Sequence, residues 1–207
     1  MKWDKLRVNN ASIWSVAFPD PEFYEKMNID CIYVGLKPPR GTPLLRFDQD
    51  ETYTNEFGQK YKKVVESSGA VAYELTNAPL KDFTLNDLKN WQMPDPLCDE
   101  IFDGLYEKCK YLHENTDKAL VGYFGASVFS TPSFIRGMEQ WFVEMIEDPE
   151  FTQLLMKRFC DYYSKMYSKA LDIAGKYLSF LRTEMDDFGS QQGPLISLDL
   201  FREQVKP

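Results

Sequence analysis

A group of ionisable side chains follows the apolar segment "YLSFL". Glu184, Asp186 and Asp187 lie close together in "EMDDFGSQQGPLIS", and Arg182 precedes them. Neighbouring carboxylates can raise the pKa of one member, which suits a general base or a hydrogen-bond acceptor for a substrate. The other interpretation is a solvated turn beside Gly189, in which the aspartates cap a helix. The residues alone leave both interpretations open.

Side-chain alternation along the preceding strand divides this group into two sets. Arg182, Glu184 and Asp186 would share one side of the strand, whereas Asp187 would lie on the other. If the first set faces a cleft, an arginine–carboxylate cluster lines it. If the second set does, Asp187 alone points in.

Other polar side chains follow the same two expected strands. Ser127 and Ser130 come directly after the apolar segment 118–125, so they either line a cleft or are ordinary loop residues. Gln191 and Gln192 come after the acids, where they either bind a ligand or brace the loop. "GYFGAS" has too few glycines for a phosphate-binding loop, and no Walker or dinucleotide motif is present.

Composition limits the function classes. The 24 basic and 32 acidic residues give a net charge of −8, which argues against a nucleic-acid surface. No apolar segment is long enough for a membrane span, and the first residues do not resemble a signal peptide. The cysteines show no metal-binding spacing, and we do not take His113 as a ligand. We therefore expect a cytoplasmic protein with reduced, mostly buried thiols, at Cys31, Cys98, Cys109 and Cys160.

The first half of the chain predicts a strand and a β-rich region. "PDPEFYEKMNI" at 19–29 is typical of a short helix, and "DCIYVGL" at 30–36 of a strand. Residues 44–90 alternate apolar and polar residues between glycine-containing turns. They predict one or two antiparallel hairpins, inserted into the main fold.

The second half predicts helices that alternate with strands. Strands at 118–125 and 176–184 separate amphipathic helices, and Ser197 caps a last helix. This pattern is typical of an α/β fold with a parallel sheet, in which reactive groups follow the carboxyl ends of strands. We expect Arg136 on a helix surface, with pairing to an acid or an anion as the alternative, and the aromatic residues of the long helix in packing. The predicted helices are 98–115, 133–147 and 148–175.

Several segments together resemble the uroporphyrinogen decarboxylase superfamily. They are "FGASVFSTPSFIRGMEQWFVEMIEDPEF" (124–151) and "DDFGSQQGPLISLDLFREQVKP" (186–207), with support from "NIDCIYV", "FGQKYKK" and "APLKDFTLNDLKNWQMPDP". The resemblance implies a (β/α)8 TIM barrel with its site at the carboxyl ends of the strands. Because the family's later "HSCG"-type segment is absent, we expect a single truncated domain over 1–207. It would hold about the first half of the barrel, with 44–90 as the β-rich insertion and 98–207 as βα units.

Within the superfamily, the sequence is more similar to the corrinoid-dependent methyltransferase-like branch. The "RQAGR" segment of authentic decarboxylases is absent, and Ser133 stands where their loop carries a tyrosine. "GLKPP" replaces their aspartate-bearing segment. The resemblance therefore implies methyl transfer with zinc and a corrinoid in a full-length protein. An authentic uroporphyrinogen decarboxylase of porphyrin biosynthesis, and a degenerate or partner-completed half-barrel without catalysis, are the alternatives.

The resemblance also favours a functional interpretation of the acids. We take Asp186 and Asp187 as candidate catalytic residues, with no metal ligand and no cofactor held by this chain alone. The expected partners are a small-molecule substrate and a corrinoid protein, without nucleic acid or membrane, and we expect the fragment alone to be inactive. The candidate substrate-binding residues are Arg182, Glu184, Gln191, Gln192, Ser127 and Ser133.

Overall fold

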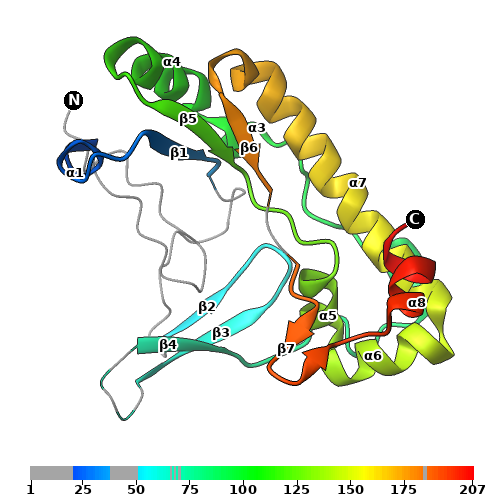
Figure 1. Cartoon of the computed structure of the whole chain (residues 1–207). Helices are drawn as coiled ribbons and strands as arrows, with labels where there is room; N and C mark the ends of the chain where they lie inside the picture. Colours follow the sequence, from blue (N-terminus) through cyan, green and yellow to red (C-terminus); the bar gives the residue numbers. More distant parts are fainter. Residues whose placement is uncertain (1–20, 38–50, 66, 68, 70, 184–185) are drawn as a thin grey trace.

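Two sheets, one parallel and one antiparallel, organise the chain. The structure is a computed structural model that describes residues 21–37, 51–65, 67, 69, 71–183 and 186–207. Figure 1 shows the parallel sheet at the top and the antiparallel sheet at the lower left, with the longest helix running from beside the parallel sheet down the right side.

The parallel sheet contains β1 (Cys31–Gly35), β5 (Ala119–Tyr123) and β6 (Phe180–Arg182), in the order β1-β5-β6. All neighbouring strands pair in parallel, which confirms the predicted α/β class with a parallel sheet. β6 is shorter than the predicted strand 176–184, because Gly175–Tyr177 forms a 3-10 turn, η2, first. Over the described residues, the parallel sheet has three strands and does not close into a barrel.

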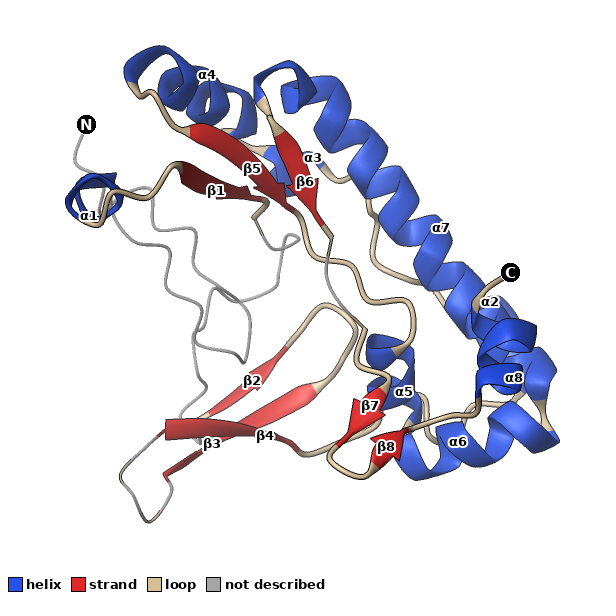
Figure 2. Cartoon of the chain, in the orientation of Figure 1, coloured by secondary structure: helices blue, strands red, loops and turns tan. Residues whose placement is uncertain are grey.

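One face of the parallel sheet is covered by helices. α4 (Leu105–Asn115) and α7 (Pro149–Ala174) lie along this face, as Figure 2 shows. Ile32, Val34 and Leu120 are buried in the core that these helices share. The residues that alternate with these along each strand point to the other face of the sheet.

Two of the predicted helices are each interrupted at a glycine. The predicted helix 98–115 is α3 (Asp99–Phe102) followed by α4, and 133–147 is α5 (Ser130–Arg136) followed by α6 (Met138–Glu147). Gly137, between α5 and α6, has φ +97° and ψ +120°, a conformation that an L side chain rarely adopts. The chain therefore changes direction here, although the apolar pattern runs on without a break.

Arg136 is buried at the end of α5, so the prediction of a surface arginine is wrong. Its side chain is 6% exposed, and it donates to both oxygens of Glu144, at 2.8 Å from Nε and 2.5 Å from Nη2. Nη1 also donates to three backbone carbonyl groups, those of Leu80, Lys81 and Phe83. A buried charge needs such partners, and Arg136 thereby ties α5 to the segment before α2 (Leu85–Asn90).

The antiparallel sheet contains β2 (Thr52–Thr54), β3 (Lys60–Val65) and β4 (Val71–Leu75). It confirms the hairpins predicted within 44–90, of which 44–50 lie outside the described residues. Figure 1 shows that the turn between β2 and β3 points toward α5 and the end of β6.

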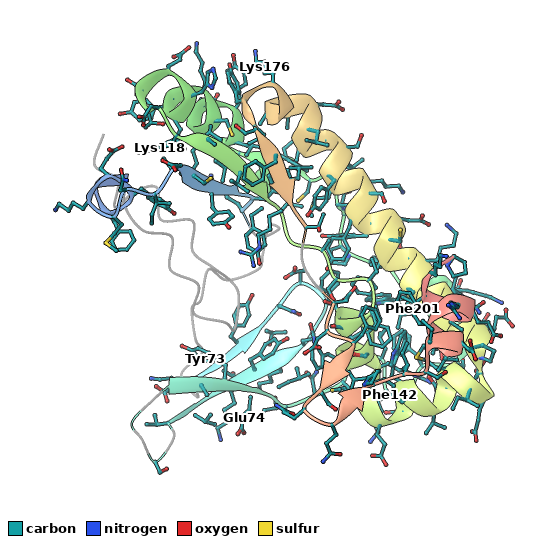
Figure 3. The ribbon with its side chains drawn as sticks, viewed as in Figure 1. Tyr73, Glu74, Lys118, Phe142, Lys176 and Phe201 are labelled. Atoms are coloured by element: carbon teal, nitrogen blue, oxygen red, sulfur yellow. The ribbon has the colours of Figure 1, made fainter. Side chains whose placement is uncertain are left out.

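Phe57 lies in this turn and attaches the antiparallel sheet to α7. Its ring centroid is 5.0 Å from that of Phe159 and 5.6 Å from that of Tyr162. Phe151, Phe159 and Tyr162 are buried, which confirms the predicted packing role of these aromatic residues of the long helix. α2 contributes to the same region through the buried Leu88. The side chains that fill this region are drawn in Figure 3.

Short elements lie at both ends of the described chain. The predicted helix 19–29 is α1 (Pro21–Lys26). After β6, a hairpin that was not predicted, β7 (Gly189–Ser190) and β8 (Gly193–Pro194), precedes the last helix. This helix is capped as predicted, because Ser197 Oγ accepts from the Leu200 N–H at 3.1 Å. It consists of α8 (Leu198–Leu200) and a π-helical turn, η3 (Phe201–Val205).

The four cysteines are free, but the expectation that most are buried is wrong. Cys109 is buried, Cys31 and Cys98 are partly buried, and Cys160 is exposed. Among the described helices, none has the length and apolar character needed to cross a membrane.

Candidate functional site

The Asp186 carboxylate joins the segment after β6 to the loop after β5. Its Oδ1 accepts from Ser127 Oγ at 2.6 Å and from the Ser130 N–H at 2.8 Å. Its Oδ2 accepts from the N–H groups of Val128 and Phe129 at 3.0 and 3.1 Å. These donors include backbone groups at the start of α5, where a negative charge is favourable.

These contacts give Asp186 a structural role. A carboxylate has about four acceptor positions, and four donors occupy them here. Asp186 would have to give up one of these hydrogen bonds before it could accept a proton from a ligand. Its catalytic role stays a prediction, whereas its role in holding the loop follows from the geometry.

Asp187 is more available than Asp186. Its N–H donates to Ser130 Oγ at 3.2 Å, and its Oδ1 accepts from the Gly189 N–H at 2.9 Å. Its side chain is exposed, and no described residue donates to its Oδ2. Among the contacts of the described residues, none would have to break for Asp187 Oδ2 to bind a ligand, which is not so for Asp186.

Arg182 lies on the sheet face opposite α4 and α7. Its guanidinium carbon is 5.7 Å from the Tyr33 ring centroid and 5.0 Å from that of Tyr123, and the two ring centroids are 6.1 Å apart. The three parallel strands thus bring one cation and two aromatic rings together near their carboxyl ends. Such a surface suits an anionic or flat ligand, because Arg presents several N–H donors in one plane.

Sequence reasoning missed Tyr33 and Tyr123. Both side chains point to the same face of the sheet as Arg182. The parallel register pairs Tyr123 with Arg182 and Gly35 with Tyr123, and Tyr33 is two residues before Gly35. Alternation within "CIYVG", "ALVGY" and "FLR" is the signal that could have found them.

The predicted serines separate into a site residue and an internal residue. Ser127 Oγ donates to Asp186 and accepts from the Thr131 N–H at 2.8 Å, so Ser127 belongs to the site. Ser133 is 3% exposed, and its hydroxyl donates to the Ser130 carbonyl within α5 at 2.8 Å. The structure does not bring Ser133 to the surface that Asp187 occupies.

The predicted glutamines lie in the turn between β7 and β8. Both side chains are exposed, and this turn is held instead by Ser190, whose hydroxyl donates to the Gly193 carbonyl at 3.0 Å and accepts from the Gln192 N–H at 3.2 Å. The side chains of Gln191 and Gln192 make no hydrogen bond to any residue that the structure describes. Glu184, predicted to share a side with Arg182, lies outside the described residues.

No metal centre is assembled in the described part of the chain. Within it, no three His, Cys, Asp or Glu side chains come together as a metal site requires. His113 is exposed on α4, with its ring 5.6 Å from that of Tyr177.

The chain was compared with protein-family models, with curated proteins and with solved structures, and none of them matches.

Proposed function

We propose that this chain belongs to the uroporphyrinogen decarboxylase superfamily and forms about the first half of a (β/α)8 barrel. The segments 124–151 and 186–207 carry the resemblance. A barrel of this kind has parallel strands in chain order with helices on the outer face. The strand order β1-β5-β6 and the position of α4 and α7 over one face of the sheet support the proposal.

The observation that carries the proposal is the contact between the two resembling segments. Asp186, from the second segment, accepts four hydrogen bonds from residues of the first. The contact lies just beyond the carboxyl ends of β5 and β6, where α/β enzymes hold their substrates. Two segments that are 56 to 59 residues apart in the chain thus build one loop region.

Within the superfamily we favour methyl transfer. Arg182, Tyr33 and Tyr123 would bind an anionic or flat ligand on the sheet face opposite α4 and α7, and Asp187 would accept a hydrogen bond from it. A corrinoid, which supplies the methyl group in this branch, would contact the same three side chains. Asp186 and Ser127 would keep the loop in place while the ligand binds.

Zinc does not fit the described residues, because they offer no set of three ligands. The protein would be cytoplasmic, with a small-molecule substrate and a corrinoid protein as its partners.

The test uses the protein at the length that its gene encodes. It is incubated with methylcobalamin, Zn²⁺ and a thiol, and the methyl thioether is quantified by mass spectrometry. A parallel reaction with uroporphyrinogen is followed by release of CO₂. We expect thioether and no CO₂.

Turnover of uroporphyrinogen would overturn the choice of methyl transfer in favour of the decarboxylase. If neither substrate reacts, the non-catalytic alternative replaces both. A reading frame that continues past Pro207 into an "HSCG"-like strand would support the enzyme, whereas a stop codon there would favour the degenerate half-barrel.

A further inference from the structure

The residue that follows Asp187 packs its side chain against two other aromatic rings. The centroid of the Phe188 ring is 4.5 Å from that of Phe129 and 5.3 Å from that of Phe201. The planes of Phe188 and Phe201 meet at 88°, and aromatic pairs in such an edge-to-face arrangement attract one another beyond the area that they bury. Phe188 is therefore held by rings from two segments that are distant in the sequence.

Phe129 joins Phe188 to the loop that Asp186 holds. The Phe129 side chain is 1% exposed, and its N–H donates to Asp186 Oδ2 at 3.1 Å. Its ring also packs against Trp141 and Phe142 of α6, with centroid distances of 6.0 and 6.3 Å. Phe188 thus packs against the same residue whose backbone binds the neighbouring aspartate.

The last helix supplies the other ring, and buried hydrogen bonds fix this helix in place. Gln204 is 8% exposed; its Nε2 donates to the Met145 carbonyl of α6, and its Oε1 accepts from Thr152 Oγ1 of α7 at 3.2 Å. The Lys206 N–H donates to the Phe201 carbonyl at 2.9 Å and closes the π-helical turn η3, which carries both Phe201 and Gln204. Because a buried amide needs such partners, η3 keeps its position against α6 and α7, and Phe201 with it.

The backbone around Phe188 is held as well. Its carbonyl accepts from the Leu195 N–H at 2.8 Å, directly after β8. On its amino side, the Asp187 N–H donates to Ser130 Oγ at 3.2 Å. One planar peptide group joins Asp187 to Phe188, so a fixed Phe188 leaves Asp187 few conformations. The position of the Asp187 carboxylate therefore depends on Phe188.

We propose that Phe188 is a positioning residue for Asp187, and that Phe201 on the last helix holds Phe188 in the position that this role requires. The last helix is thereby part of the candidate site. What Asp187 does for a ligand rests on the proposed function, whereas its fixed position exists without a ligand. Loss of the Phe201 ring lets Phe188 move, and the Asp187 side chain then populates several rotamers.

Two matched variants separate this role from general packing. F201L removes the ring that packs against Phe188, and F142L removes a ring that packs against Phe129 from α6. Both make the same chemical change at a partly buried position of one aromatic cluster, and both residues are labelled in Figure 3. F201Y keeps the ring and should restore the behaviour of the wild type.

The first measurement is hydrogen exchange of the Asp187 and Leu195 amides, with the amides of β5 as the reference for global opening. In F201L we expect protection of the two amides to fall by about two- to tenfold relative to β5, the range that one aromatic pair supplies. In F142L any loss should be the same at these amides and in β5. An F201L chain in which the two amides lose no more protection than β5 would overturn the proposal.

The second measurement is the set of three-bond NMR couplings that report the χ1 rotamer of Asp187. The wild type, F142L and F201Y should give the couplings of one staggered rotamer, and F201L should give values averaged over several. A loss of overall stability does not change the rotamer within the folded state, so this measurement separates positioning from stability. Wild-type couplings in F201L, or equal averaging in F201L and F142L, would contradict the role of Phe188.

The third measurement connects the position of Asp187 to a ligand. In a titration with methylcobalamin, F201L should raise the Kd by about two- to tenfold, and F142L should leave it unchanged. An unchanged Kd in F201L would show that Phe201 does not act on the ligand through Asp187. A wild-type chain that binds no methylcobalamin would overturn the proposed function instead, and the two ligand-free measurements would then decide whether Phe188 positions Asp187.

Discussion

At the scale of single residues, Asp186 holds the loop after β5, and its replacement should destabilise the fold. In D186N one oxygen becomes an NH₂ group, which cannot accept, so two of the four donors lose their partner. We expect a loss of about 2 kcal/mol in the free energy of unfolding, measured by urea denaturation. The matched control is D187N, which keeps the acceptor for Gly189 and should stay within about 0.5 kcal/mol of the wild type. Equal effects of the two substitutions would contradict the assignment.

The Arg136–Glu144 pair gives a second prediction at this scale. Burial raises the pKa of Glu144, but hydrogen bonds from Arg136 and Gln140 and the Arg136 charge outweigh it, and the pKa lies below 4.5. A depressed pKa adds stability above pH 4.5 that disappears as the pH falls through the folded value. The wild type should therefore lose more stability than E144Q between about pH 6 and about pH 3, as measured by urea denaturation. Equal losses would show that this pair contributes nothing to the acid sensitivity.

At the scale of elements, Gly137 makes α5 and α6 two helices. An alanine Cβ would find only ordinary contact, 3.5 Å from Ala78, so the cost of G137A is the strained backbone at φ +97°. We expect a loss of about 1–3 kcal/mol in the free energy of unfolding. G175A is the control, because Gly175 has a helical φ of −56°. This substitution should leave the free energy of unfolding unchanged or raise it by about 0.4–1 kcal/mol. A G137A chain as stable as G175A would mean that the bend does not depend on this glycine.

The elements also show how far the sequence predicts this fold. The strands at 30–36 and 118–125 and the long helix follow from apolar runs and helix-end signals, and the structure contains each of them. The breaks at Gly104 and Gly137 were missed, because the apolar periodicity continues through both glycines. β7 and β8 have two residues each, which is too short for an alternating apolar and polar pattern to be recognised.

The candidate site was predicted less completely than the strands. Its acids were found because they follow a strand, but the partners of Asp186 are 56 to 59 positions away, and only tertiary structure reveals them. Arg136 was expected on the surface, because it is a charged residue next to a glycine. Its three backbone carbonyl partners belong to a distant segment, and the local sequence does not reveal them.

At the scale of the whole molecule, Phe57 attaches the antiparallel sheet to the rest of the fold. F57A removes a ring packed against Phe159 and Tyr162 and should cost about 3–5 kcal/mol. Hydrogen exchange should show protection falling more in β2, β3 and β4 than in the parallel sheet. V65A, at an exposed apolar position of the same sheet, should change stability by about 0.5 kcal/mol or less. A uniform loss over both sheets would mean that they unfold as one unit.

At the same scale, we propose that the face of the parallel sheet with Tyr33, Tyr123 and Arg182 binds the ligand, together with Asp187. The most direct test is a titration of the isotope-labelled 207-residue chain with methylcobalamin, followed by NMR chemical shifts. The account predicts that the largest chemical-shift changes occur at Tyr33, Tyr123, Arg182 and Asp187. Saturable changes confined to the helix-covered face, or no changes at these four residues, would contradict it.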